Sequence, residues 1–179
     1  MPLITTQLDT KKHTHTTSYI PTLIANTLTP TYHRHMTTLS LFRTLWDTQP
    51  HHCEVPETRA LEYLTTPRKT TAKNKLPLWS PTEFLPGSTR LGANAVAIHW
   101  LVYDMDDGLS SFDSWQIWGK LGYTVAAHTS YSHTPEHHKY RIALPLLEPI
   151  PASDWPRAAI AANELWAKVV GVGVLIVAP

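Results

Sequence analysis

The sequence predicts an α+β domain in which a β-α-β-β-α-β core follows a strand–helix extension. Short apolar runs, rich in β-branched and aromatic residues and bounded by turn residues, indicate the strands. Stretches with apolar residues at helical spacing indicate the helices. At 179 residues the chain has the length of one ordinary domain and can bury a core.

Residues 1–35 differ from the rest of the chain. They are rich in threonine and histidine and have no sustained apolar periodicity. They also contain no signal-peptide pattern and no stretch long enough to span a membrane. We expect residues 1–35 to be a disordered extension, or to precede the true start at Met36, and 36–179 to form the folded domain. We expect no membrane partner, and the lone Cys53 favours a reducing, cytoplasmic location.

The extension is predicted to contain a strand at 37–43 and a short helix at 56–64. Leu39 and Leu41 share one face of the strand. The apolar side of the helix consists of Ala60, Leu61 and Leu64. Between them, His51-His52-Cys53 is interpreted as a polar loop, since no second cysteine cluster completes a zinc site.

Two irregular segments follow the extension. Residues 66–77 are polar and basic, with Arg68, Lys69, Lys73 and Lys75, and are interpreted as a solvated loop. A phosphate-contacting loop is the alternative. Residues 77–90 combine proline, aromatic residues and glycine, and we expect them to cross the core without regular structure.

The core begins with a strand at 96–104, followed by a helix at 110–120. Ser110 or Ser111 is the expected N-cap, and Gly119 and Gly122 the expected end of the helix. The predicted buried stripe of this helix is Phe112, Trp115, Trp118 and Leu121.

Two strands, 123–129 and 140–146, are predicted to flank a polar hairpin loop at 130–138. A second helix follows at 154–169, with Ser153 as N-cap and Pro156 in the first turn. Its sheet-facing residues are predicted to be Trp155, Ala159, Ala162, Leu165 and Trp166. A last apolar run, 172–177, completes the order typical of ferredoxin-like and RRM-like folds.

Charge is unevenly distributed along the chain, whose formal net charge is +1. Residues 36–103 are more basic than acidic, whereas residues 104–179 are more acidic than basic. A general polycation for nucleic acid is therefore excluded, and any polynucleotide contact has to be local or supported by metal ions.

The first candidate site lies where the strand 96–104 ends. Asp104 and Asp106 project from the same face of an extended chain, roughly 7 Å apart. Two carboxylates aimed the same way can share hard cations, although acids and glycine also mark ordinary turns. Asp107 lies off the shared face and is expected to cap the turn.

A second candidate site, residues 128–135, lies where the strand 123–129 ends. His133 comes soon after a strand, where an imidazole can ligate a metal, move a proton or bind phosphate. Lys139 and Arg141 share a face of the following strand, and both side chains suit phosphate. His137 and His138 are interpreted as a polar hairpin tip.

These residues resemble the motifs of a known superfamily. Asp104-Met105-Asp106 after an apolar strand resembles the first motif of the archaeo-eukaryotic primase superfamily, and Ser-Tyr-Ser-His133 is loosely similar to its second motif. The run 129–155 resembles primase-polymerase domains of phage, plasmid and other mobile-element replication proteins. The resemblance covers about residues 36–170 and is strongest over 98–155.

The resemblance implies a metal-dependent nucleotidyltransferase of DNA replication with an RRM-like core. Asp104 and Asp106 would hold two Mg²⁺ or Mn²⁺ ions, and nucleoside triphosphates would be added to a primer on a DNA template. His133 and the nearby Ser132 would contact the triphosphate, and Lys139 and Arg141 would offset its charge. A fused or separate helicase is the expected partner.

One departure from the family pattern affects activity. The third motif of the superfamily is an aspartate that follows an apolar residue on a later strand, but no acid follows Glu164. We therefore expect a chain truncated or frameshifted near residue 170, or a degenerate domain. Such a chain would bind Mn²⁺-nucleotide weakly and extend a primer little.

Two other functions stay open. A degenerate nucleotide- or DNA-binding replication module needs no third carboxylate. A haloacid-dehalogenase-type phosphatase also has Asp-x-Asp after an apolar strand, but Gly108 stands where that family favours Thr or Val. The predicted β-β hairpin also replaces the parallel crossovers of that family.

Overall fold

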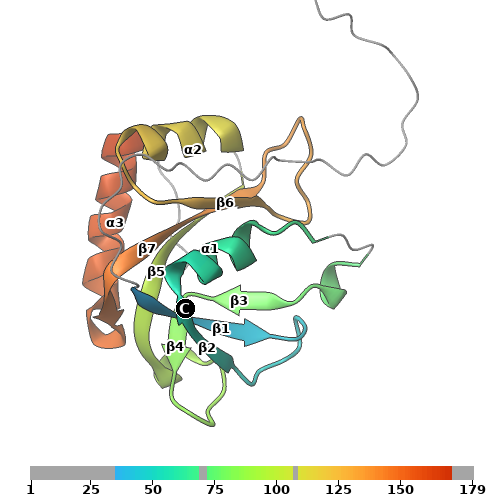
Figure 1. Cartoon of the computed structure of the whole chain (residues 1–179), viewed down its shortest axis with the longest axis vertical. Coiled ribbons are helices and arrows are strands. Elements are labelled where there is room, and N and C mark those ends of the chain that lie inside the picture. The colour runs from blue at the N-terminus through green and yellow to red at the C-terminus, as the bar shows by residue number, and fades with distance from the viewer. Residues whose placement is uncertain (1–34, 69–71, 107–108, 171–179) are drawn as a thin grey trace, which may run out of the picture.

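The computed structural model describes residues 35–68, 72–106 and 109–170. Two antiparallel sheets and three α-helices in this part of the chain confirm the α+β class (Figure 1). The strands are β1 (Met36–Phe42), β2 (His51–Pro56), β3 (Leu78–Ser80), β4 (Thr82–Phe84), β5 (Ala95–Met105), β6 (Ala126–Thr129) and β7 (Tyr140–Pro151). The helices are α1 (Glu57–Thr65), α2 (Ser111–Lys120) and α3 (Trp155–Val170), with 3₁₀ turns η1 (Lys73–Lys75), η2 (Gly92–Asn94) and η3 (Ala152–Asp154).

The larger sheet has the strand order β4-β5-β7-β6 and buries both faces. On one face, Trp100 and Val102 of β5 pack with Leu39 of β1 and Leu61 of α1. On the other face, Tyr103 of β5 packs against the helices α2 and α3. The alternation of side chains along β5 therefore produces two separate cores.

Five elements of the predicted core occur in the predicted order, β5-α2-β6-β7-α3. β7 lies between β5 and β6 and is antiparallel to both. The sixth element, the strand predicted at 172–177, lies outside the described residues, so the RRM-like order stays a prediction. Residues 1–34 of the expected N-terminal extension also lie outside them.

The strand–helix extension is present and leads into a second sheet, β2-β1-β3. As predicted, Ala60, Leu61 and Leu64 of α1 are buried. The interpretation of His51-His52-Cys53 as a loop is wrong, because these residues belong to β2, which pairs with β1 along its whole length. The expectation of irregular chain at 77–90 is also wrong in part, since β3 and β4 lie there.

The helices match their predictions at most positions. Ser110 caps α2, where its Oγ accepts a hydrogen bond from the backbone N–H of Asp113. Trp118 is buried as predicted, but Phe112 and Leu121 are more than half exposed, so the apolar stripe is narrower than expected. In α3, Trp155, Ala162 and Trp166 are buried, whereas Ser153 lies within η3 and is not an N-cap. Among the described residues, no helix is both long and apolar enough to cross a membrane.

Candidate functional site

The two predicted carboxylates at the end of β5 each form an ion pair with a cation from β7. Asp104 Oδ2 lies 3.0 Å from Arg141 Nη2, and these two residues are direct partners in the β5–β7 register. Asp106 Oδ1 lies 3.3 Å from Lys139 Nζ. Residues two apart on a strand share a face, so the four side chains gather on one face of the sheet. We call Asp104, Asp106, Lys139 and Arg141 the charged quartet.

The quartet continues the face of β5 that also builds a core. Trp100 and Val102 on this face are buried, whereas the side chain of Asp104 is 31% exposed and that of Asp106 is 79% exposed. Along this face of β5, the side chains are therefore buried in the core up to Val102 and increasingly exposed to solvent from Asp104 onward. A ligand can reach the carboxylates from the solvent end, while the strand below them is fixed by packing.

His128, the first residue of the predicted stretch 128–135, extends this row of charges, although the sequence assigned it no role of its own. It is the direct partner of Arg141 in the β6–β7 register, so Asp104, Arg141 and His128 lie across three adjacent strands. Its Nε2 atom and the Nε atom of Arg141 are both buried without a hydrogen-bond partner in the described structure. Burial, and then the positive charge of Arg141, lower the pKa of His128 to about 4. The ring is therefore neutral at pH 7.

His133 lies in the loop between β6 and β7, beside the start of the quartet. Its Nδ1 accepts a hydrogen bond from the backbone N–H of Lys139, at 3.1 Å. In the neutral ring the proton then lies on Nε2, which is a donor. Burial lowers the pKa of His133, and the neighbouring His138 lowers it further. Among the described residues, the contacts of His133 include Lys139 and His138 but neither carboxylate, and Ser132 is exposed in the same loop.

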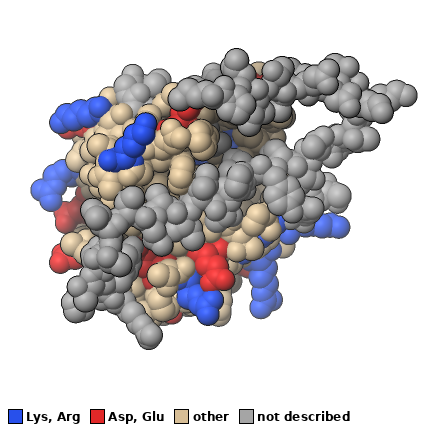
Figure 2. Space-filling view, turned by 45° about the horizontal axis from the view of Figure 1, so that its top comes forward, with Lys and Arg blue, Asp and Glu red and all other residues tan. Residues whose placement is uncertain are grey.

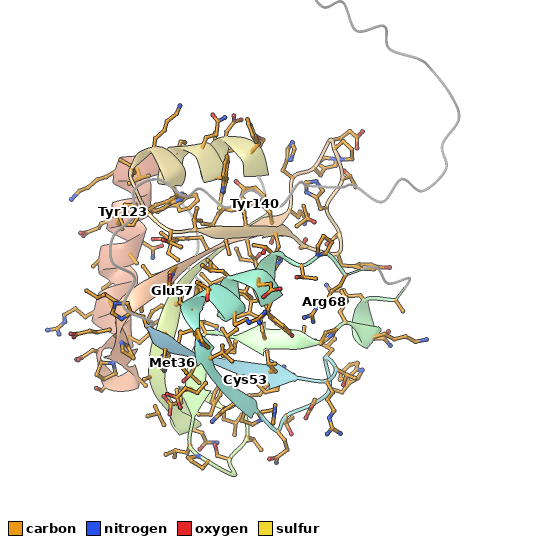
Figure 3. All side chains as sticks on the ribbon, in the orientation of Figure 1. Met36, Cys53, Glu57, Arg68, Tyr123 and Tyr140 are labelled. Atoms are coloured by element: carbon orange, nitrogen blue, oxygen red, sulfur yellow. The ribbon has the colours of Figure 1, made fainter. Side chains whose placement is uncertain are left out.

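A buried tyrosine connects the chain beyond the carboxylates to the sheet. Tyr140, labelled in Figure 3, lies between the two cations but on the opposite face of β7. Its hydroxyl donates to the carbonyl of Leu109 at 2.9 Å and lies 2.6 Å from the Ser114 hydroxyl in α2. Tyr140 therefore holds Leu109 and Ser114 of α2 against β7.

The quartet offers only part of a metal coordination shell. Carboxylate oxygens are the ligands that Mg²⁺ and Mn²⁺ prefer, so Asp104 and Asp106 fit a hard cation chemically. Within residues 35–68, 72–106 and 109–170, no three His, Cys, Asp or Glu side chains converge as a metal site. The remaining ligands would come from water or from phosphate oxygens, because Mg²⁺ in proteins is commonly bound by one or two carboxylates together with substrate phosphates.

Comparisons of the chain with family models, with curated proteins and with solved structures find no match. The resemblance to primase-polymerase domains therefore rests on the motifs alone, and the geometry of the charged quartet is independent of it.

Proposed function

We propose that this chain is a nucleotidyltransferase domain of the primase-polymerase type, and that the charged quartet binds a divalent metal–nucleoside triphosphate. The observation that carries the proposal is the arrangement of the quartet. Two carboxylates and two cations face each other at the ends of two adjacent strands. A metal–triphosphate complex presents both a cation and oxyanions, and so matches both kinds of side chain.

In the absence of ligand, the ion pairs hold the four side chains close to one another. Binding would replace these ion pairs by contacts with the metal and the phosphates. When the ligand binds, Asp104 and Asp106 would hold the metal, and Arg141 and Lys139 would turn to the phosphates. Arginine can bind two phosphate oxygens at once, whereas lysine acts as a point charge. Because the Asp104–Arg141 pair is only half-buried, breaking it costs less than breaking a fully buried pair.

The bound metal, His133 and Tyr140 would each contribute to the site in a different way. The bound metal would reduce the charge repulsion of the triphosphate and favour attack by a primer hydroxyl. His133 would donate its Nε2 proton to a phosphate oxygen, while Lys139 N–H holds the ring. Tyr140 would hold Leu109, which lies soon after Asp106 in the chain, against β7.

Binding of Mn²⁺ together with a fluorescent deoxynucleoside triphosphate tests the proposal. Asp104→Asn should weaken nucleotide binding at least tenfold. In EDTA, the variant and the unmodified chain should have the same nucleotide affinity. Asp154→Asn is the matched control, since Asp154 forms an exposed ion pair with Arg157 on α3. Equal affinity of the Asp104→Asn variant and the unmodified chain would overturn the proposal.

A second function is a nucleotide-binding replication module without synthesis. It is favoured by the presence of only two converging carboxylates in the described part of the chain, both already neutralised by cations. Primer extension separates the two functions, because the module would bind nucleotide without adding it. The antiparallel pairing of β5 with β7 disfavours the phosphatase alternative, because that family has parallel crossovers.

A further inference from the structure

Trp46 is the most exposed aromatic side chain among the described residues, with 77% of its surface accessible. It lies in the loop that joins β1 to β2, far along the chain from the charged quartet. A tryptophan exposed to this extent gives no stability through burial. Its exposure therefore suggests a binding partner.

The loop that carries Trp46 has a defined conformation. The carboxylate of Asp47 accepts hydrogen bonds from the backbone N–H groups of Arg43 and Gln49, each at 3.0 Å. These hydrogen bonds, first that of Arg43, lower the pKa of Asp47. The guanidinium of Arg90 donates to the carbonyl of Leu45 at 2.6 Å. The indole is thus presented by an ordered loop, which reduces the entropy lost when a ligand binds.

Three exposed cations lie near this loop. Phe42 pairs with Leu78, so Arg43, which follows β1, lies beside the segment that precedes β3. That segment contains Lys73 and Lys75 in η1, and neither lysine forms an ion pair within the described residues. Lys and Arg side chains project from the right-hand edge in Figure 2, the side on which η1 lies in Figure 1.

The surface carries excess positive charge. The segments 43–50 and 72–77 contain three cations and one acid, Asp47, whose carboxylate is occupied by backbone N–H groups. Arg68, labelled in Figure 3, follows α1 in the chain. It is exposed, and its charge contributes to lowering the pKa of His128, which places it near the quartet.

We propose that Trp46, Arg43, Lys73 and Lys75, which we call the loop-end surface, bind single-stranded nucleic acid. A base would stack on the indole, and the adjacent phosphates would contact the cations. The identity of this strand as the template rests on the proposed function. In this proposal the strand continues past Arg68, an exposed cation near the quartet, toward the bound nucleotide.

Fluorescence anisotropy of a labelled oligodeoxythymidine, measured with the full chain in EDTA, tests the proposal. Trp46→Ala should weaken binding about tenfold, and Trp46→Phe should retain most of it, because stacking contributes about 1–3 kcal/mol per base. Leu147→Ala is the matched control, since Leu147 is 78% exposed in β7, a strand of the other sheet. Equal affinities of Trp46→Ala and Leu147→Ala would overturn the proposal.

The lysines are tested by the salt dependence of the same binding. Lys73→Ala/Lys75→Ala should reduce the slope of log affinity against log salt by about 1.4, because each single-strand phosphate contact contributes about 0.7. Lys120→Ala/Lys168→Ala removes two exposed lysines from α2 and α3 and should leave the slope unchanged. Equal changes of the slope in the two double variants would mean that lysines attract the oligonucleotide wherever they lie on the surface. This result would overturn the proposal.

The two proposals fail separately. Oligodeoxythymidine binding in EDTA needs no metal, so Asp104→Asn should not reduce it. Loss of nucleotide binding without loss of oligonucleotide binding in this variant supports the quartet's function and shows that oligonucleotide binding does not depend on Asp104. Retained nucleotide binding in Asp104→Asn would overturn the quartet's function, while the result for Trp46→Ala would still decide the loop-end surface.

Discussion

Asp104 and Arg141 are direct partners across β5 and β7, and their side chains form an ion pair with 3.0 Å between Oδ2 and Nη2. The pair lies where a packed sheet face opens to solvent. Arg141→Gln should therefore reduce the free energy of unfolding by about 1 kcal/mol, as expected for a pair that solvent partly screens. The same variant should weaken Mn²⁺-nucleotide binding, because Arg141 would contact the phosphates.

Arg157→Gln is the control for this prediction. Arg157 pairs with Asp154 at 3.7 Å on the exposed side of α3, so its loss should change stability by less than about 0.5 kcal/mol. Urea unfolding and nucleotide titration measure both quantities. An Arg141→Gln variant with unchanged nucleotide affinity would remove Arg141 from the site.

The lowered pKa of His128 predicts how the free energy of unfolding depends on pH. The ordinary pKa of 6.5 is lowered to about 4 in the folded chain, so between these values the unfolded chain binds a proton that the folded chain does not. Stability is therefore lost as pH falls through this window. For this residue alone, the loss between pH 7 and pH 5 is about 2 kcal/mol.

His128→Asn should remove this part of the pH dependence. Urea unfolding at pH 7 and pH 5 should show a smaller difference in the variant than in the unmodified chain. His51→Asn, at the exposed start of β2, should keep the full difference. An unchanged pH dependence in His128→Asn would show that His128 is accessible to protons in the folded chain.

Tyr140→Phe tests whether Tyr140 positions the nucleotide site or only stabilises the fold. The change removes the hydroxyl that bonds Leu109 and Ser114, and should cost about 1–3 kcal/mol because buried polar groups lose their partner. Tyr103→Phe is the matched control: its buried hydroxyl donates to the carbonyl of Ala162 at 2.9 Å in the α3 core. Both variants should be destabilised, but only Tyr140→Phe should also weaken nucleotide binding. Equal nucleotide affinities would assign Tyr140 a purely structural role.

The proposed function makes a prediction about synthesis. The unmodified chain should extend a primer little, because two carboxylates cannot complete a two-metal site. An aspartate introduced within 172–177, for example Val174→Asp, should increase primer extension. Leu147→Asp adds an acid at an exposed position of β7 and should have no effect. Vigorous synthesis by the unmodified chain that survives Asp104→Asn would contradict the assignment of the carboxylates.

Elements with a clear apolar period were predictable from the sequence. α2 and α3 each have one strongly buried side, and β5 is an apolar run buried on both faces, so the pattern alone located them. β2 was missed because its residues are polar and only half-buried, and backbone pairing with β1 defines it. Backbone hydrogen bonds leave no such trace in the side-chain pattern.

The candidate site was predictable only in part. Alternation placed Asp104 with Asp106, and Lys139 with Arg141, but not one pair opposite the other. That pairing depends on the register between β5 and β7. The sequence does not show this register, because α2 and β6 separate the two strands along the chain. The role of His128 could not be assigned for the same reason, since its place beside Arg141 depends on β7 lying between β5 and β6.

The central position of β7 has a consequence for synthesis on the ribosome. β5 and β6 are made before β7, so each lacks this neighbour until residues 140–151 have left the exit tunnel. During this interval β5 exposes an apolar edge that carries Trp100, and such edges invite pairing with other chains. A nascent chain paused before Tyr140 should therefore depend on chaperones, whereas one that has passed Pro151 can close its own sheet.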